Sequence, residues 1–343
     1  MPILGVIEGF YGRPWSQADR RFLIAVLRTL GLNAYLYAPK SDAYLRREWT
    51  RPWPESQRRL LRELSTAAEE ALIEFAVGLS PYDLYRNYSA SARRSLRARV
   101  EEIIACGVRS LALLFDDMPG DLPDLAARQA EITNDVAAWS GQNVTLRVCP
   151  TYYSDDPVLD RVFGRRPSNY LAALSHQIVH SVSLFWTGPK VCSDTVTIEH
   201  LANVRSGLMH PIALWDNYPV NDSKQRSEHL FLRPFHEREV GANLDSHWSN
   251  AMNQMALSLP ALASLGKLYG RDTPEVGEVY RRAGLSSALI RACLPLAETS
   301  RSELSTDAEA SLRTLAGADS LAAKELDAWL NGAYVFDPAC LTD

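Results

Sequence analysis

The sequence predicts an α/β fold, a (β/α)8 TIM barrel followed by a C-terminal helical appendage. Over the first 265 residues, short strand-like runs alternate with longer amphipathic stretches. Eight strands with intervening helices in roughly 250 residues match the size and rhythm of such a barrel. From residue 270 onward the chain is instead rich in Ala, Leu and Glu and has helical patterns. A doubly wound open sheet is the alternative for the first part.

The expected strands are short apolar runs bounded by turn-forming residues. They span residues 3–8, 33–37, 73–79, 110–116, 145–149, 181–186, 211–216 and 241–245. The runs near residues 182 and 241 give the weakest signals, because the helices expected beside them are short.

Five longer stretches have the apolar spacing of amphipathic helices. They cover residues 17–30, 55–71, 90–106, 122–139 and 249–265. In the second of these, Leu60, Leu61 and Leu64 recur at helical spacing among Arg and Glu residues, which indicates a helix with one buried face.

The region after the barrel carries three further amphipathic patterns, at residues 275–283, 286–298 and 308–330. We therefore expect the barrel to occupy residues 1–268 and a helical region to occupy residues 269–343. The helical region should pack on the barrel. The same pattern also fits a homodimer interface.

Composition and charge exclude several classes of protein. The net charge is −5 and the pI is about 5.9, so no basic surface indicates a nucleic-acid partner. No apolar run approaches the ~20 residues of a membrane span, and the N-terminus reads directly as a strand without the features of a signal peptide. We therefore expect a cytoplasmic protein with no membrane partner. The five cysteines lack CxxC spacing, so neither a disulfide framework nor a zinc site is expected.

Two adjacent carboxylates, Asp116 and Asp117, stand at the end of the fourth apolar run and before a Pro-Gly breaker. A run this apolar suits a strand buried on both faces, as in a parallel sheet, which places both acids at its C-terminal tip. Because neighbours in a strand point to opposite faces, the two side chains should diverge unless the strand has already begun to turn. The alternative is a structural turn or N-cap pair.

In a barrel the active site lies where the strands end, so the residues at the C-terminal tips carry the most information about function. These tips are residues 8–15, 37–42, 116–117, 149–153, 186–190, 215–222 and Asn243. They combine carboxylates, amides, a lysine and several Trp and Tyr rings. Sugar recognition requires such a set, because hydroxyls need polar partners and pyranose C–H faces stack on aromatic rings. No phosphate-binding glycine loop and no nucleophilic Ser or Cys constellation competes with this interpretation.

Six ordered motifs at these tips resemble those of a known family. They are GVIEGFYGRPW, YLYAPKSD, LALLFDDM, CPTYY, WTGPKV and WDNYPVND, and the resemblance covers roughly residues 3–260. By these motifs the chain closely resembles the catalytic domain of the family 84 glycoside hydrolases. That family contains the β-N-acetylglucosaminidases called O-GlcNAcases, as well as hyaluronidase-like enzymes.

The resemblance implies a retaining, substrate-assisted mechanism without a carboxylate nucleophile. In such a reaction the substrate's 2-acetamido oxygen attacks its own anomeric carbon and forms an oxazoline intermediate. On the family pattern, Asp116 accepts the acetamido N–H and stabilises the developing charge, and Asp117 protonates the leaving oxygen and then activates water. Adjacent acids in a partly desolvated pocket cannot ionise equally easily, so one should titrate higher and serve as the acid.

The resemblance also implies a set of substrate-binding residues. Those expected to position the acetamido group or to form the wall around it are Tyr153, Asn217, Trp215 and Tyr11. Those expected to hold the sugar O3, O4 and O6 hydroxyls are Gly9 (through its backbone), Lys40, Asp222 and Asn243. For His247 we expect a structural role. The loops at 82–88, 118–123 and 154–167 match no family motif, and we expect them to select the leaving group.

The resulting prediction is a β-N-acetylglucosaminidase that acts on terminal β-linked N-acetylglucosamine and needs no metal or organic cofactor. Its partner is a carbohydrate, with a protein serine or threonine, a glycan or a cell-wall fragment as leaving group. Two alternatives stay open. One is a hydrolase of the same mechanism for another 2-acylamido sugar, such as an N-acetylgalactosaminide. The other is a carbohydrate-binding protein that keeps the pocket and has lost turnover.

Overall fold

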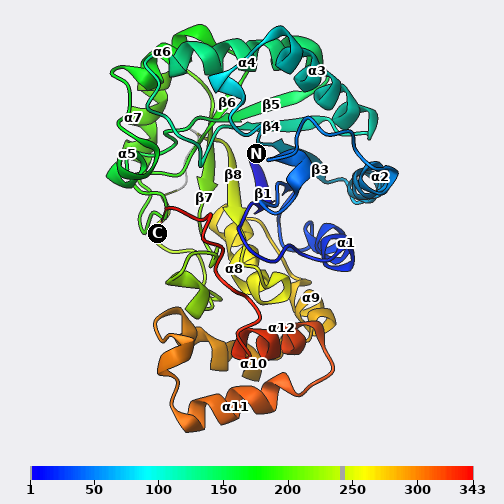
Figure 1. Ribbon diagram of the computed structural model, residues 1–343. Coiled ribbons are helices and arrows are strands. Elements are labelled where there is room, and N and C mark those ends of the chain that lie inside the picture. The colour runs from blue at the N-terminus through cyan, green and yellow to red at the C-terminus, as the bar shows by residue number, and fades with distance from the viewer. Residues whose placement is uncertain (1, 240–243, 343) are drawn as a thin grey trace.

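The structure is a computed structural model that describes residues 2–239 and 244–342. Its parallel strands pair in sequence order and form a closed barrel, since β8 also pairs with β1 (Figure 1). The strands are β1 (Ile3–Glu8), β2 (Ala34–Tyr37), β3 (Glu74–Leu79), β4 (Ser110–Leu114), β5 (Thr145–Cys149), β6 (Ser183–Trp186), β7 (Ile212–Asp216) and β8 (Leu244–Asn250). The closed barrel confirms the predicted fold class and excludes the open sheet.

Helices surround the barrel between successive strands (Figure 1). They are α1 (Gln17–Val26), α2 (Glu55–Glu70), α3 (Ala90–Ala105), α4 (Leu125–Ser140), α5 (Pro157–Phe163), α6 (Tyr170–Gln177), α7 (Ile198–Leu208) and α8 (Met255–Leu268). The amphipathic patterns predict α1 to α4 well. They do not define α5, α6 or α7, because helices this short repeat the apolar spacing too few times.

The last strand of the barrel extends further along the chain than predicted. Of the strand expected at 241–245, residues 241–243 lie outside the described residues, and β8 continues past residue 245 to Asn250. The helix expected at 249–265 begins too early, since α8 starts at Met255. The pattern fails here because β8 carries polar residues whose partners come from other parts of the chain. His247 is fully buried in the strand, and its Nε2 lies 3.2 Å from Asp216 Oδ2. A buried histidine with such a partner has a structural role.

A buried ion pair lies at the tip of β1. Glu8 is fully buried, and its carboxylate accepts two hydrogen bonds from Arg20, from Nε and Nη2, each 2.8 Å long. The backbone N–H of Trp15 and the hydroxyl of Tyr35 also donate to it. A buried charge requires this degree of pairing and hydrogen bonding. Glu8 therefore fixes the start of the loop that follows β1.

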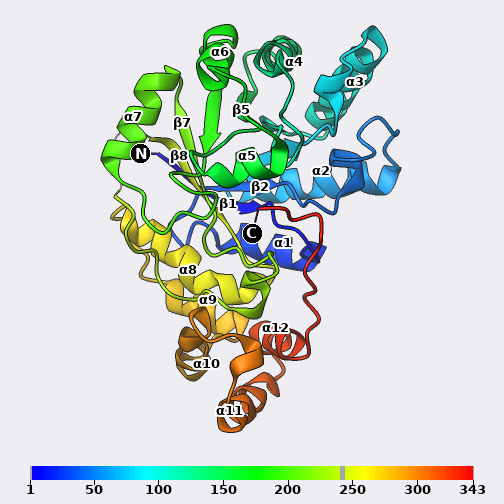
Figure 2. The same ribbon diagram turned by 60° about the vertical axis from the view of Figure 1, so that its left-hand side comes forward.

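After α8 the chain builds a helical appendage beside the barrel (Figure 2). The appendage contains α9 (Val276–Ala283), α10 (Ser287–Cys293), α11 (Thr306–Ala316) and α12 (Leu321–Leu330). The pattern expected as one helix over 308–330 is therefore two helices, α11 and α12. Helix α12 packs against α8, and the segment after α12 runs back toward the barrel (Figures 1 and 2). The boundary placed at residue 268 stays a prediction.

One buried carboxylate links the appendage to the barrel. Glu325 of α12 accepts hydrogen bonds from the backbone N–H groups of Ala256 and Leu257, in the first turn of α8, each 3.1 Å long. Burial of the carboxyl raises the pKa of Glu325 from 4.5 to about 8. The carboxyl is therefore protonated at neutral pH in the folded protein.

We expect this group to make the folded protein less stable as the pH rises. At pH values between 4.5 and about 8, the Glu325 carboxyl binds a proton in the folded chain but not in the unfolded chain. Its contribution to the free energy of unfolding is therefore complete below about pH 4.5 and is lost as the pH passes about 8. Urea unfolding at a series of pH values measures this slope. Glu325→Gln, which is neutral at every pH, should flatten it, and an unchanged slope in the variant contradicts the assignment.

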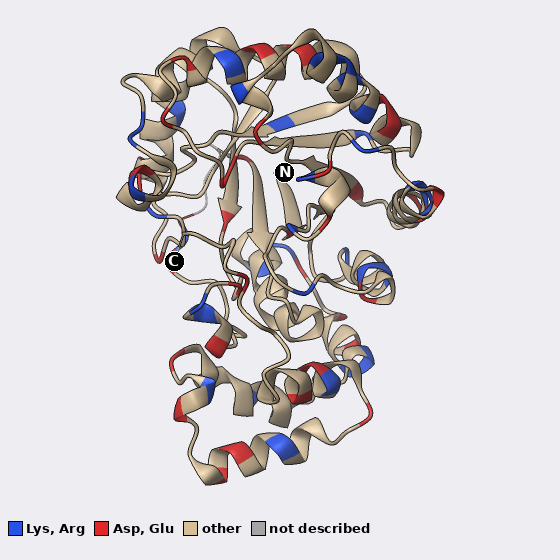
Figure 3. Cartoon of the chain, in the orientation of Figure 1, with Lys and Arg blue, Asp and Glu red and all other residues tan. Residues whose placement is uncertain are grey.

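Positively and negatively charged residues are interspersed along the outer helices (Figure 3). Arg97 and Glu101 of α3 form an ion pair 2.8 Å long, and Arg313 and Glu309 of α11 form another of the same length. Among the described helices, none is long and apolar enough to cross a membrane.

Candidate active site

Asp116 and Asp117 lie just beyond the end of β4, where both line a cavity of about 480 Å³. The strand ends at Leu114, and Asp117 has a positive φ of 54°, so the backbone has left the extended conformation. The two side chains do not diverge to opposite faces, because the strand has already begun to turn. This turn allows both carboxylates to enter one cavity.

Lys40, on the loop after β2, joins the two acids. Its ammonium donates a hydrogen bond to Asp116 Oδ2 and lies 3.5 Å from Asp117 Oδ2. The three side chains are 5%, 9% and 8% exposed, in the order Lys40, Asp116 and Asp117. Burial lowers the pKa of Lys40, but the two carboxylates outweigh this effect and raise it. Lys40 is therefore a permanent cation at the centre of the site.

Two phenols donate hydrogen bonds to Asp117. The Tyr11 hydroxyl lies 2.7 Å from Oδ2, and the Tyr153 hydroxyl lies 3.3 Å from Oδ1. Burial by itself raises the pKa of Asp117. The charges of Lys40 and Arg46, together with the hydrogen bonds from the two phenols, lower this pKa by a larger amount, so the net shift is downward. This direction is opposite to the one expected of the acid. The prediction considered the two carboxylates without the cations that surround them.

One oxygen of Asp116 is unpaired. Its Oδ1 is buried and has no hydrogen-bond donor among the described residues, while Oδ2 accepts from Lys40. A buried acceptor left without a donor costs about 1–3 kcal/mol. An atom of this kind in a cavity wall is suited to accept a hydrogen bond from a bound molecule.

Amide hydrogen bonds connect the tips of β1, β7 and β8. Asn217 Oδ1 accepts from Trp215 Nε1 and from Asn250 Nδ2, each at 3.0 Å. Asn250 Oδ1 in turn accepts from the backbone N–H of Gly9 at 3.3 Å. A Cβ atom at Gly9 would lie 2.8 Å from the Trp215 ring, so only glycine allows this close approach. These contacts fix the orientation of the Trp215 ring, which lines the cavity.

Asp222, on the loop after β7, accepts a hydrogen bond from the backbone N–H of Tyr11 at 2.7 Å. Burial raises the pKa of Asp222 to about 6. Its carboxylate is therefore fully available as an acceptor only above about pH 6.

The cavity brings together every predicted site residue that the structure describes. These residues are Gly9, Tyr11, Lys40, Asp116, Asp117, Tyr153, Trp215, Asn217 and Asp222. Asn243 lies outside the described residues. Asn250 lines the cavity at the tip of β8, and the sequence analysis missed it because the predicted eighth strand ends at residue 245. Within residues 2–239 and 244–342, no group of three or more His, Cys, Asp or Glu side chains is arranged to hold a metal ion.

The loops expected to select the leaving group, at 82–88, 118–123 and 154–167, contribute no residue to the lining of this cavity. The long loop after β7 and the helical appendage contribute instead. The appendage and the segment after it supply Ala297, Glu298, Cys340 and Thr342. Only the folded chain brings these residues to the barrel, and no local sequence pattern marks them.

Comparison with known proteins identifies the family. A model of the β-N-acetylglucosaminidase family matches residues 4–281, which is most of the chain. The chain belongs to the β-N-acetylglucosaminidase family. This membership confirms the resemblance found in the strand-tip motifs. It also confirms the expected class of enzyme, a glycoside hydrolase of the β-N-acetylhexosaminidase type.

Relatives of this β-N-acetylglucosaminidase family member include the Protein O-GlcNAcases of Mus musculus and Rattus norvegicus. Each is 32% identical over 246 residues, which is 69% of this chain and 26% of the relative. The chain thus spans about a quarter of the length of these curated relatives. A solved structure of a mutant Thermobaculum terrenum O-GlcNAc hydrolase has a TM-score of 0.77 and 27% identity, and the match covers 96% of this chain and 80% of that one. That structural similarity therefore extends over nearly the whole chain.

Proposed function

We propose that this protein is a retaining β-N-acetylglucosaminidase that hydrolyses terminal β-linked N-acetylglucosamine with the help of the substrate's own acetamido group. The unpaired, buried Oδ1 of Asp116 carries the proposal, because it needs a hydrogen-bond donor. The acetamido N–H of the substrate is such a donor. The names of the relatives, which refer to O-GlcNAc, support N-acetylglucosamine as the sugar.

In the proposed reaction, the acetamido carbonyl oxygen attacks the anomeric carbon while the bond from that carbon to the leaving oxygen breaks. Asp117 transfers its proton to the leaving oxygen, and the Asp116 carboxylate offsets the positive charge that forms on the oxazolinium ring. Water then attacks the anomeric carbon and gives a proton to Asp117. The ring C–O bond breaks and restores the acetamide. Two displacements at one carbon give retention of configuration.

The other lining residues suit the two ends of the sugar. The acetamido group can pack against the rings of Trp215, Tyr153 and Tyr11, and the two tyrosines also carry hydroxyls. Asn217 already accepts two hydrogen bonds and donates one to Val191 O at 2.8 Å, so we expect it to act mainly by positioning Trp215. The residues expected at the sugar hydroxyls are Gly9, Lys40 and Asp222, with Asn250 added from its place at the tip of β8.

Asp117 must gain a proton before it can act as the acid. In the free site, Lys40 and Arg46 disfavour that proton. A sugar that fills the cavity displaces water and strengthens desolvation, which raises the pKa of a carboxyl. We therefore expect the alkaline limb of kcat, which reports the complex, to lie at higher pH than that of kcat/KM, which reports the free enzyme.

Asp222 is expected to make the binding of the sugar itself depend on pH. Its pKa of about 6 means that the carboxylate is progressively lost as the pH falls below 6, and with it an acceptor for the sugar hydroxyls. The Kd of free N-acetylglucosamine, measured by calorimetry, should therefore rise through this range. Asp222→Asn should bind more weakly and show no change of Kd near pH 6, whereas a change that persists in the variant assigns the titration to another group.

The proposed activity is tested by the hydrolysis of 4-nitrophenyl β-N-acetylglucosaminide, with the anomer of the first product followed by NMR. We expect hydrolysis with retention and no turnover of the matching β-glucoside, which lacks the acetamido group. Inversion, or equal activity on the glucoside, contradicts the mechanism. Preference for the 4-epimer indicates the alternative sugar, and binding without hydrolysis of either epimer indicates the alternative of a carbohydrate-binding protein.

Other aspects of the function stay predictions. They include the identity of the leaving group, dimerisation through the C-terminal helices and a cytoplasmic location. The expected absence of a metal, an organic cofactor, a nucleic-acid partner and a membrane partner also stays a prediction.

A further inference from the structure

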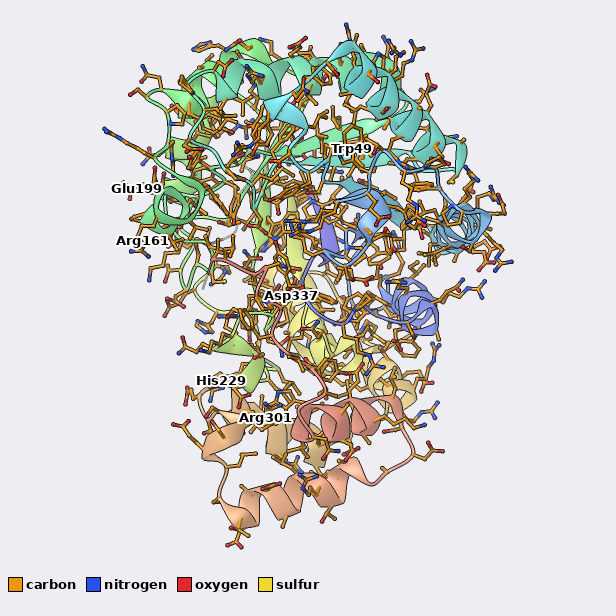
Figure 4. All side chains as sticks on the ribbon, viewed as in Figure 1. Trp49, Arg161, Glu199, His229, Arg301 and Asp337 are labelled. Carbon is orange, nitrogen blue, oxygen red and sulfur yellow. The ribbon has the colours of Figure 1, made fainter. Side chains whose placement is uncertain are left out.

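A second cavity, of about 220 Å³, adjoins the catalytic one. The two share six lining residues, which are Cys192, Asn217, Arg226, Phe231, Ala297 and Glu298. Most of them come from the loop after β7 and from the helical appendage. His229, which lines the larger cavity, lies where the barrel meets the appendage (Figure 4). A substrate group beyond the reacting sugar can therefore reach this junction.

Most cations around the two cavities are already neutralised by carboxylates. Lys40 pairs with the two catalytic acids. Arg238 donates two hydrogen bonds to Asp216, 2.7 and 3.0 Å long, and both side chains are buried. Arg233 pairs with Glu298. These pairs leave little net charge to attract a ligand.

Arg226 differs from these cations. It lies in the short 3-10 helix η3 (Arg226–Glu228), and no carboxylate of the described residues forms an ion pair with it. Its Nε donates to Val220 O at 2.9 Å, and its guanidinium carbon lies 4.3 Å from the centroid of the Phe231 ring. These contacts hold the guanidinium plane. Its two terminal nitrogens have no hydrogen-bond acceptor among the described residues, and they carry four N–H donors.

Apart from the catalytic pair, two described carboxylates, Asp222 and Glu298, line the larger cavity with Arg226, and both are engaged elsewhere. Asp222 interacts with Arg226 only at longer range, and its Oδ2 accepts from the backbone N–H of Tyr11. Glu298 pairs with Arg233, and this hydrogen bond lowers the pKa of Glu298. Arg226 is thus an oriented cation in the wall between two cavities, with its donors unused.

We propose that Arg226 binds an oxoanion, a carboxylate, sulfate ester or phosphate ester, that the substrate carries next to the reacting sugar. The inference rests on the proposed function and narrows its substrate class to anionic N-acetylglucosaminides. Hydrogen bonds from a guanidinium to an oxoanion are charge-assisted and bidentate, and partial burial protects them from screening by salt. Ser223 and Gln225, which line the larger cavity, can add neutral donors.

Two positions on a substrate can supply this oxoanion. One is the leaving group, because Arg226 lies in the wall shared with the second cavity, which it lines together with Glu298 and Ala297 of the appendage. The other is the sugar O6, because Asp222, one of the residues expected to hold the sugar hydroxyls, precedes Arg226 on the same loop. In both cases Arg226 donates hydrogen bonds to an oxoanion. Substrates that carry the oxoanion at one position or the other distinguish the two cases.

The test measures kcat/KM of the full-length chain on three substrates. They are 4-nitrophenyl β-N-acetylglucosaminide, its 3-carboxy-4-nitrophenyl analogue and its 6-O-sulfated analogue. The first is neutral, the second carries the anion on the leaving group, and the third carries it on the sugar. The variants are Arg226→Gln, Arg226→Lys and, as a matched control, Lys224→Gln. Lys224 is exposed on the same loop and lines neither cavity, so the control removes the same charge outside the site.

We expect Arg226→Gln to lose about tenfold more in kcat/KM on one anionic substrate than on the neutral one, which corresponds to about 1.4 kcal/mol. Arg226→Lys should retain part of the preference, and Lys224→Gln should retain all of it. The substrate affected identifies the position of the oxoanion. Equal losses on all three substrates show that Arg226 only supports the loop and overturn the inference, as does an equal effect of Lys224→Gln. If the wild type fails to hydrolyse the neutral substrate as well as the anionic ones, the proposed function itself is wrong.

Discussion

Asp117→Asn is expected to reduce kcat/KM by about 10³-fold on an N-acetylglucosaminide with an alkyl leaving group, because a missing general acid costs 10²- to 10⁴-fold. Asparagine preserves the shape of the side chain and can still accept a hydrogen bond from one of the two phenols, Tyr11 or Tyr153, but its amide group is not an acid. The loss should be much smaller on 4-nitrophenyl β-N-acetylglucosaminide, whose leaving group departs without protonation. Steady-state kinetics on the two substrates measures the difference.

Asp116→Asn is the matched control. It removes the charge proposed to stabilise the oxazolinium ion, so it should slow both substrates by a similar factor. Azide, which can attack the oxazoline in place of activated water, should restore activity to Asp117→Asn only. A loss in Asp117→Asn that is the same for both leaving groups, or rescue of both variants by azide, contradicts the assigned roles. Near-ultraviolet circular dichroism checks that both variants keep the native packing.

Glu8→Ala is expected to cause the largest loss of stability, about 3–5 kcal/mol in the free energy of unfolding. The substitution leaves the buried Arg20 guanidinium without its carboxylate and removes the acceptor of the Trp15 N–H and the Tyr35 hydroxyl. Urea unfolding of the purified variant gives the change directly. Activity should fall as well, because Glu8 fixes the loop that carries Gly9 and Tyr11.

Two comparisons make this prediction specific. The double variant Glu8→Ala, Arg20→Met removes both buried charges and should be less destabilised than Glu8→Ala alone. Glu48→Ala breaks an ion pair with Arg51 in which the side chains are 46% and 62% exposed, and we expect no measurable change. If Glu8→Ala unfolds at the same urea concentration as Glu48→Ala, the buried pair does not stabilise the barrel.

The barrel could be predicted because its strands are short and apolar and its first four helices repeat a clear apolar spacing. The catalytic pair could be predicted because two acids directly follow a buried strand. The end of the eighth strand could not be placed, since His247 and Ser249 are polar and their partners lie elsewhere in the chain. For the same reason Asn250, now placed beside Gly9 and Asn217, was missed.

Electrostatics and long-range contacts were the least predictable features of the site. The charges of Lys40 and Arg46 beside Asp117 reverse the pKa direction expected for two adjacent acids, and only the folded barrel brings the three together. Likewise, Glu298 and Thr342 reach the cavity from the appendage and the segment after it, without any motif of their own. Local patterns specify strand tips, whereas the neighbours of those tips depend on tertiary structure.

The most direct test of the account is the rate of hydrolysis across glycosides whose acetamido group carries zero, one, two or three fluorine atoms. Fluorine withdraws electrons from the amide oxygen and weakens it as a nucleophile. If that oxygen attacks the anomeric carbon, kcat/KM should fall steeply with each added fluorine, over several orders of magnitude in all, while the leaving group stays the same. A rate that is nearly independent of fluorine content would show that the enzyme, and not the substrate, supplies the nucleophile.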